Sequence, residues 1–397
     1  MNSKAKTRLV AGLLSLAMIF GGSSIVAATS LPEISTDTRI DGDVQEFMLS
    51  GIEFTLGAML FDPNFDTLDF GVVLELGTRL NVYRFEHGFL QPIDDIHWYP
   101  LLSDGEVIFV VSVHGDPNSP TIIINDEFAT VLQNFRGRDS SPFALLFMGA
   151  NLYAVTESDM VFLRSYAVTD AESVIAPFAD FDSRSVNMQF GAVDVVAEVV
   201  PDVMSAMARS NMIRTLAVPV VGQGVGTRLC WASVVSSVEH YFYMSRNHRP
   251  GRQPHTASNV ALARGIHPNT GANIGQLRET LVAFGVPLTN SCRVINSSPS
   301  LANIRELIFN WQSPIPTLFH PQGNPQLMGH YVLFRSYNFN ANTGQILLSY
   351  MDSALMNGFG NFAMIFNPPA TGRLSISYRG SVIYATQHLP LWIMPGN

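Results

Sequence analysis

The chain has 397 residues, of which 47% are hydrophobic and only 14% are charged, and its formal net charge is −9. Charged residues usually make up about 25% of a soluble domain. The acidic balance leaves no basic surface, which excludes a function in binding nucleic acid or another polyanion. The length exceeds the roughly 100–200 residues of one domain, so two domains are expected.

The first 28 residues have the three-part layout of a secretory signal peptide. Basic residues near the N-terminus precede an uncharged apolar run from residue 9 to about residue 22, and small residues follow up to Ala28. The apolar run is shorter than the roughly 20 residues that span a bilayer, which argues against an uncleaved membrane anchor. We therefore expect cleavage after Ala28, secretion, and no membrane segment once the signal is removed.

Residues 29–202 alternate short apolar runs with turn sequences, which predicts a mainly antiparallel sheet. Strands are predicted at residues 72–76, 80–85, 107–113 and 152–155, and helices at residues 52–60 and 128–135.

Residues 203–217 fit neither pattern and are predicted to link two domains. Isolated basic residues, among them Arg209 and Arg214, would suit proteolytic processing. A linker helix that is never cut explains this segment equally well.

Residues 218–397 place helices first and strands second, which is an α+β layout. Helices are predicted from Trp231 to about Met244, and at residues 274–284 and 301–311. Strands are predicted at residues 315–320, 330–337, 345–351 and around 374–385.

Cys230 stands at the start of the first of these helices, beside Trp231. The free N–H groups and the positive end of the dipole at a helix start favour a thiolate, the nucleophile of thiol hydrolases. A buried apolar thiol is the simpler alternative. A disulfide with Cys292 is another, since these are the two cysteines of an exported chain, although their unlike sequence contexts favour different roles.

A thiol hydrolase also needs a base, a group that orients the base, and donors for the oxyanion. Among ten histidines, His330 is the preferred base because it begins an apolar strand and can project from a sheet edge. His320, at the end of the preceding strand, is its rival. Asp352 ends the next strand and can orient His330, although aspartate is also a common turn residue. Gln223 can donate its side-chain amide to the oxyanion, together with the cysteine N–H.

The order of these motifs resembles the papain-like cysteine peptidase superfamily: Gln, then Cys-Trp-Ala at a helix start, then Gly-His before an apolar strand, then Asp after the next strand. The closer likeness is to the compact bacterial branch, which includes secreted and effector-type papain-like proteases and the peptidases that cut double-glycine leaders. It covers about residues 218–388. It implies a cleft between a helical half and an antiparallel sheet half, with Cys230, His330, Asp352 and Gln223 as the catalytic residues.

Two features depart from the papain pattern. Papain-like enzymes often carry Asn at the third catalytic position with a Trp soon after, whereas Asp352 is followed by Ser353 here. Gln223 lies seven positions before Cys230, slightly farther than in papain. The first departure fits the compact bacterial branch.

The resemblance implies a secreted cysteine endopeptidase that hydrolyses a polypeptide substrate through a Cys-His-Asp triad and an acyl-enzyme, with no cofactor and no metal. The amino-terminal region, residues 29–202, resembles the prodomains of secreted bacterial members. It predicts a zymogen held latent by intramolecular inhibition, and a permanent targeting or wall-binding domain is the alternative. Two other functions stay open: a thiol amidase or acyltransferase acting on cell wall or small amides, and a non-enzymatic secreted binding protein.

Overall fold

The computed structural model describes residues 42–60, 72–86, 88–116, 119–125, 127–139, 141–149, 151–165, 188–202, 213–224, 227–245, 253–340, 346–354, 361–365, 373–378 and 381–392. The predicted signal peptide and residues 203–212 of the predicted linker lie outside these ranges. Residues Ile40–Asn397 form one compact unit. None of the helices in the described ranges has the length and apolar character needed to cross a membrane.

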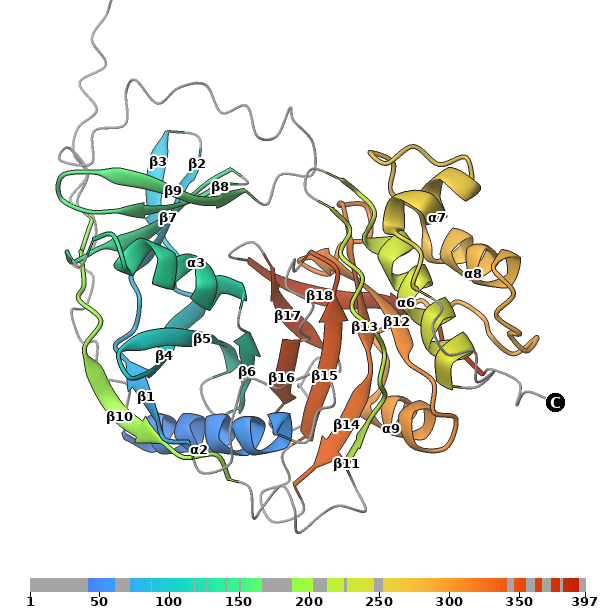
Figure 1. The fold of residues 1–397 in the computed structure, drawn as a ribbon, viewed down its shortest axis with the longest axis horizontal. Helices are drawn as coiled ribbons and strands as arrows, with labels where there is room; N and C mark the ends of the chain where they lie inside the picture. The colour runs from blue at the N-terminus through green and yellow to red at the C-terminus, as the bar shows by residue number, and fades with distance from the viewer. Residues whose placement is uncertain are drawn as a thin grey trace, which may run out of the picture. The chain divides into compact units, whose positions relative to one another are not determined.

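The fold is α+β, as the sequence predicted: the described residues form six helices and two sheets whose strands are mostly antiparallel (Figure 1). The large sheet runs, in spatial order, through β10 (Val195–Val199), β1 (Leu74–Gly77), β4 (Ile96–Ser103), β5 (Glu106–Asp116), β6 (Ser119–Asn125), β16 (Asn361–Ile365), β15 (Ile346–Asp352), β13 (His330–Phe334), β12 (Ile315–Pro321), β18 (Ser381–His388) and β17 (Ser375–Tyr378). Beside β15 lies β14 (Ser336–Phe339), which pairs in turn with β11 (Ile213–Thr215). The smaller sheet has the order β3 (Phe89–Pro92), β2 (Val82–Glu86), β7 (Ala144–Met148), β8 (Asn151–Val155) and β9 (Met160–Ser165).

One sheet joins the amino-terminal and carboxyl-terminal parts of the chain. Strand β6 pairs antiparallel with β16, with Ile124 opposite Phe362. The cores interlock as well, because Ile123 packs among carboxyl-terminal apolar residues while Leu347 packs among amino-terminal ones. The predicted boundary near residue 202 therefore separates two segments that share backbone hydrogen bonds and core.

The predicted linker ends in a strand. Residues 213–215 of this segment form β11, where Arg214 lies opposite Tyr337 of β14. Arg214 also donates from Nη1 to the Phe309 carbonyl over 3.0 Å. The carboxyl-terminal part of the sheet therefore begins before residue 218.

Two helices pack on the amino-terminal strands, α2 (Gly42–Met59) against β6 and β10, and α3 (Glu127–Arg136) against β5 and β9. The sequence predicted α2 only from residue 52, since Gly51 has a low helix propensity. Helix α2 nevertheless includes Gly51, because its packing against the sheet outweighs the low helix propensity of this residue. Gly57 permits a close approach: a Cβ at this position would lie 2.5 Å from the carbonyl oxygen of Asp202.

The carboxyl-terminal helices are α6 (Cys230–Ser245), α7 (Ala257–Ala263), α8 (Ile274–Ala283) and α9 (Leu301–Phe309). Helix α6 lies against β13, and α7 and α8 pack on α6 (Figure 1). Asn273 caps α8 in a capping box with Gln276, and Ser300 caps α9. This packing holds the start of α6 beside the start of β13.

We expect Leu347→Ala to destabilise the whole unit by about 2–5 kcal/mol, because it removes a fully buried β15 side chain from the amino-terminal core. Calorimetry of the full chain should show one cooperative transition moving to lower temperature. Leu262→Ala, at a position 78% exposed on α7, is the control and should change stability by less than about 0.5 kcal/mol. Two separate transitions, only one of which moves, would contradict the shared core.

Candidate active site

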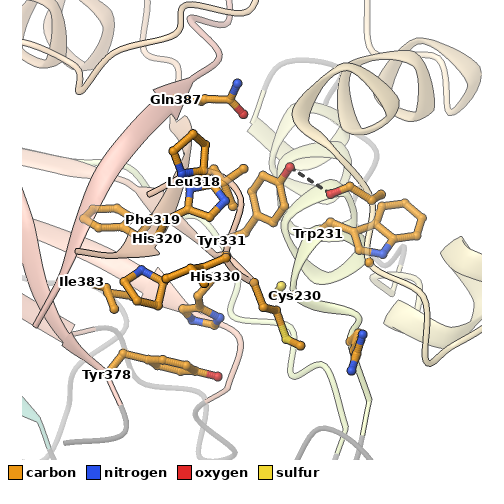
Figure 2. Close-up of a pocket in the computed structure, with 18 of the residues that line it drawn as sticks. Cys230, Trp231, Leu318, Phe319, His320, His330, Tyr331, Tyr378, Ile383 and Gln387 are labelled. Carbon is orange, nitrogen blue, oxygen red and sulfur yellow. Dashed lines mark hydrogen bonds between the residues drawn. The ribbon is translucent and has the colours of Figure 1, made fainter. Parts of the chain in front are cut away.

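Cys230 is the first residue of α6 and is half-buried. The N–H of Ser233 donates to the Leu229 carbonyl over 2.9 Å, which makes Leu229 the residue that precedes the first helical turn. The N–H of Cys230 therefore belongs to the group of amides that have no intrahelical acceptor. Leu229 and Trp231 are fully buried on either side and anchor the helix start. Cys230 itself lines a cavity (Figure 2), so its sulfur lies at the positive end of the helix and is open to a substrate.

His330 and Asp352 form the hydrogen-bonded pair that the sequence predicted. Nε2 of His330 lies 2.7 Å from Oδ1 of Asp352, and both side chains are 5% exposed. Asp352 lies opposite Val332 on the adjacent strands β15 and β13. His330 is two positions from Val332 and so projects from the same face of the sheet. The Ala354 N–H also donates to Oδ1 over 2.9 Å, which helps to hold this oxygen in place.

The surroundings of His330 favour its charged form. Burial by itself lowers the pKa of His330, but the charge of Asp352 opposes it and, with contributions from Tyr378 and from hydrogen bonds to Asp352 and Cys230, raises the pKa well above the ordinary value. Because Nε2 is taken by Asp352, Nδ1 is the nitrogen left to exchange a proton with the Cys230 thiol. The three side chains therefore form a continuous path from sulfur to imidazole to carboxylate.

Tyr378 of β17 stacks on His330, a contact that the sequence analysis missed. The ring centroids lie 4.2 Å apart at an interplanar angle of 14°. An aromatic face at this distance stabilises a cation by about 0.5–2 kcal/mol and keeps water from one side of the imidazole. No local pattern around Tyr378 could have revealed this contact, because it depends on how β17 is placed in the sheet.

Gln223 lies in the loop before α6 and lines the same cavity as Cys230 and His330. Its backbone N–H donates to the Ser353 carbonyl over 2.9 Å, and its Oε1 accepts from the Ser353 hydroxyl over 3.4 Å. The amide nitrogen contacts the Thr227 carbonyl at 3.4 Å, which is long for a hydrogen bond. Since Ser353 holds Oε1 of Gln223, the N–H₂ group of the Gln223 amide is the end available for an incoming oxyanion.

The alternatives considered for the other candidates are resolved by their contacts. His320, the rival base, directs Nδ1 to the Thr386 hydroxyl at 2.6 Å, away from the pair formed by His330 and Asp352. Both cysteines are free thiols. Cys292 is fully buried, and its sulfur lies 3.4 Å from the Trp392 carbonyl. The structure therefore contains no disulfide between Cys230 and Cys292.

A cavity of about 680 Å³ opens beside the cysteine, within the usual range for ligand sites. Figure 2 shows Cys230, His330 and Tyr378 around it, with Leu318, His320 and Ile383 from the sheet. Tyr331 donates its hydroxyl to the Ala272 carbonyl over 3.0 Å and so ties β13 to the segment before α8 (Figure 2).

Gly329 is required by close packing beside this cavity. A Cβ at this position would lie 2.7 Å from both Leu318 Cδ1 and His320 Nε2. The glycine before the candidate base therefore keeps the wall formed by Leu318 and His320 close to His330.

The amino-terminal region contacts two segments of the site. Arg164 of β9 donates from Nη2 to the Ala354 carbonyl over 2.9 Å, in the turn that carries Asp352. Arg84 of β2 donates from Nη2 to the hydroxyl of Ser381, which lines the cavity, over 2.6 Å. All lining residues nevertheless lie between Gln223 and Gln387, so the described part of the amino-terminal region supports this cavity without filling it.

Among the residues that the structure describes, no group of three or more His, Cys, Asp or Glu side chains could hold a metal ion.

No protein-family model matches the chain, and the search of curated proteins gives no significant match. A statement about function therefore depends on the geometry of the site.

We expect Asp352→Asn to lower the pKa of His330, because it removes the negative charge that opposes burial. A partner charge at this distance commonly shifts a pKa by about 1–3 units. Titration of the His330 ring protons by NMR, compared with the wild type, measures the shift. A His330 pKa that does not move would show that Asp352 does not set its protonation.

Proposed function

We propose that the protein is a papain-like cysteine peptidase that cleaves a polypeptide through Cys230, His330 and Asp352. The observation that carries this proposal is the thiol at a helix N-terminus beside a buried imidazole whose other nitrogen lies 2.7 Å from a carboxylate oxygen. Such a set forms a thiolate–imidazolium pair, which a structural cysteine does not need.

The geometry supports the following sequence of steps. The Cys230 thiolate attacks the scissile carbonyl carbon, and the resulting oxyanion accepts hydrogen bonds from the Cys230 N–H and the Gln223 amide. The imidazolium of His330 gives its Nδ1 proton to the leaving amine as the C–N bond breaks, which leaves an acyl-enzyme. His330 then accepts a proton from water, whose oxygen attacks the thioester carbonyl. Breakage of the C–S bond releases the acid and restores the thiolate–imidazolium pair.

The protein is proposed to be exported and made as a precursor, in line with its amino-terminal sequence. Strand β6 shares backbone hydrogen bonds with β16, and Arg164 holds the turn after Asp352. A chain cut between the two parts would therefore stay associated. Latency would then depend on the fit between the parts, and intramolecular inhibition by the amino-terminal region stays a prediction.

We expect iodoacetamide to label Cys230 at mildly acidic pH much faster in the wild type than in His330→Ala. The reason is that the imidazolium of His330 and the helix N-terminus both favour the thiolate. Peptide mapping across pH 4 to 9, on the wild type and on His330→Ala, measures this rate. Cys292 is the internal control, since it is fully buried and should label only after unfolding. Equal labelling rates in the two proteins across this pH range would contradict the ion pair and favour a binding protein.

A comparison of casein with isolated cell wall as substrates identifies the kind of bond that the protein cleaves. Hydrolysis of casein by the wild type and not by Cys230→Ser would support the peptidase, whereas hydrolysis of isolated cell wall alone would favour the thiol amidase.

We expect Gln223→Ala to lower kcat by about 100–1,000-fold, the usual cost of removing one oxyanion donor. Gln223→Glu keeps the side-chain size but removes the N–H donors, and should be at least as impaired. Cys230 labelling should be nearly unchanged in Gln223→Ala, because the oxyanion exists only after attack on a carbonyl. An equal loss of labelling and turnover would show that Gln223 acts through the fold of the loop.

A further inference from the structure

A second imidazole, besides that of His330, lines the cavity beside the cysteine. His320 is the next-to-last residue of β12, is 5% exposed, and lines the cavity together with Leu318, Leu327 and Ile383. Leu327 and Met328 are 42% and 51% exposed at the rim. The reaction described above does not use His320, so the role of this buried imidazole needs another explanation.

A β-bulge fixes the orientation of the His320 ring. Leu318 pairs with Gln387 and Phe319 pairs with Ala385, so Thr386 is the extra residue of β18. Its hydroxyl donates to the Leu318 carbonyl over 3.2 Å and lies 2.6 Å from His320 Nδ1. A hydroxyl has one proton. With that proton on the Leu318 carbonyl, the contact with His320 is made by Nδ1–H donating to the Thr386 oxygen.

The second nitrogen of the ring is therefore an acceptor. Burial lowers the pKa of His320, so the ring is neutral at pH 7, and a neutral imidazole protonated on Nδ1 has a lone pair on Nε2. No protein group within the described ranges donates to Nε2. A Cβ on Gly329 would lie 2.7 Å from this nitrogen, which places the acceptor beside the residue that precedes His330. Glycine at this position leaves the ring edge open to the cavity.

We propose that His320 Nε2 accepts a hydrogen bond from the substrate side chain that occupies this cavity, and so selects an aromatic residue with a donor at its tip, tyrosine above all. The proposal rests on the proposed peptidase function, because it assigns the cavity to a residue next to the scissile bond. Leu318, Leu327 and Ile383 contact the ring of such a side chain, and His320 receives its hydroxyl proton. A cavity with only apolar walls would favour leucine or phenylalanine instead, because it would offer no acceptor for a hydroxyl proton.

The test uses two libraries of peptides that are identical except for tyrosine or phenylalanine at each position flanking the scissile bond. At one of these positions the wild type should cleave the tyrosine peptide with a kcat/KM about tenfold higher, the factor that one neutral hydrogen bond commonly provides. In His320→Leu the ratio should fall to about one or below. His320→Gln, which can place an amide oxygen near the original Nε2, should restore part of the preference. Leu262→Ala on the exposed face of α7 is the control, and its ratio should equal that of the wild type.

A second measurement separates recognition from cleavage. Calorimetric titration of the same peptides into full-length Cys230→Ala should show about tenfold tighter binding of the tyrosine peptide. Equal affinities, or a tyrosine preference retained in His320→Leu, would overturn the role of His320 even if the peptides are cleaved. Tighter binding of the tyrosine peptide without cleavage by the wild type would support His320 and overturn only the peptidase. If His320→Leu does not fold, Thr386→Val provides the test, because it releases Nδ1 and should reduce the preference.

Discussion

The buried hydrogen bond between His330 and Asp352 is the interaction on which the candidate site depends. Removing an imidazolium and a carboxylate from water costs several kcal/mol per ion, and the cost is offset only by good geometry and further hydrogen bonds. Here the Nε2 to Oδ1 distance is 2.7 Å, the Ala354 N–H donates to the same oxygen, and Tyr378 covers the ring. The bond also directs Nδ1 toward Cys230. A sheet made of adjacent strands β13 and β15 supplies the rigidity that such a pair requires.

The continuous sheet explains how that rigidity extends beyond the carboxyl-terminal half. Strand β16 lies between β15, which carries Asp352, and β6 of the amino-terminal part. Without β6, the edge of β16 would present unpaired N–H and carbonyl groups, a condition that proteins usually avoid. The amino-terminal part therefore stabilises the strand that positions the orienting carboxylate. The contact of Arg164 with the Ala354 carbonyl acts on the same turn.

Much of the site could be predicted from the sequence because its residues lie at the ends of regular elements. Cys230 precedes a helical apolar pattern, and His330 and Asp352 bound apolar strands, so local periodicity placed all three. The pairing of β6 with β16 could not be predicted, because no local signal in Ser119–Asn125 links it to residues beyond 360. Tyr378 and Thr386 were missed for a related reason: their roles depend on register and on a bulge between distant strands. Helix α7 was not predicted, because its seven residues are too few to show a helical period, although Thr256 caps it.

The arrangement of the amino-terminal part bears on how such an enzyme could be controlled. An inhibitory region that works by occlusion places its own residues among those that line the cavity, and the described residues of this region do not lie there. A region that instead stabilises the site contacts the segments that bear the site residues, without entering the cavity. Arg164 and Arg84 contact the turn after Asp352 and the hydroxyl of Ser381 in this second way. Loss of the region would thus disturb the carboxylate and one cavity wall together. Support of this kind makes the amino-terminal part a determinant of the geometry of the candidate site, whether or not the chain between the two parts is cut.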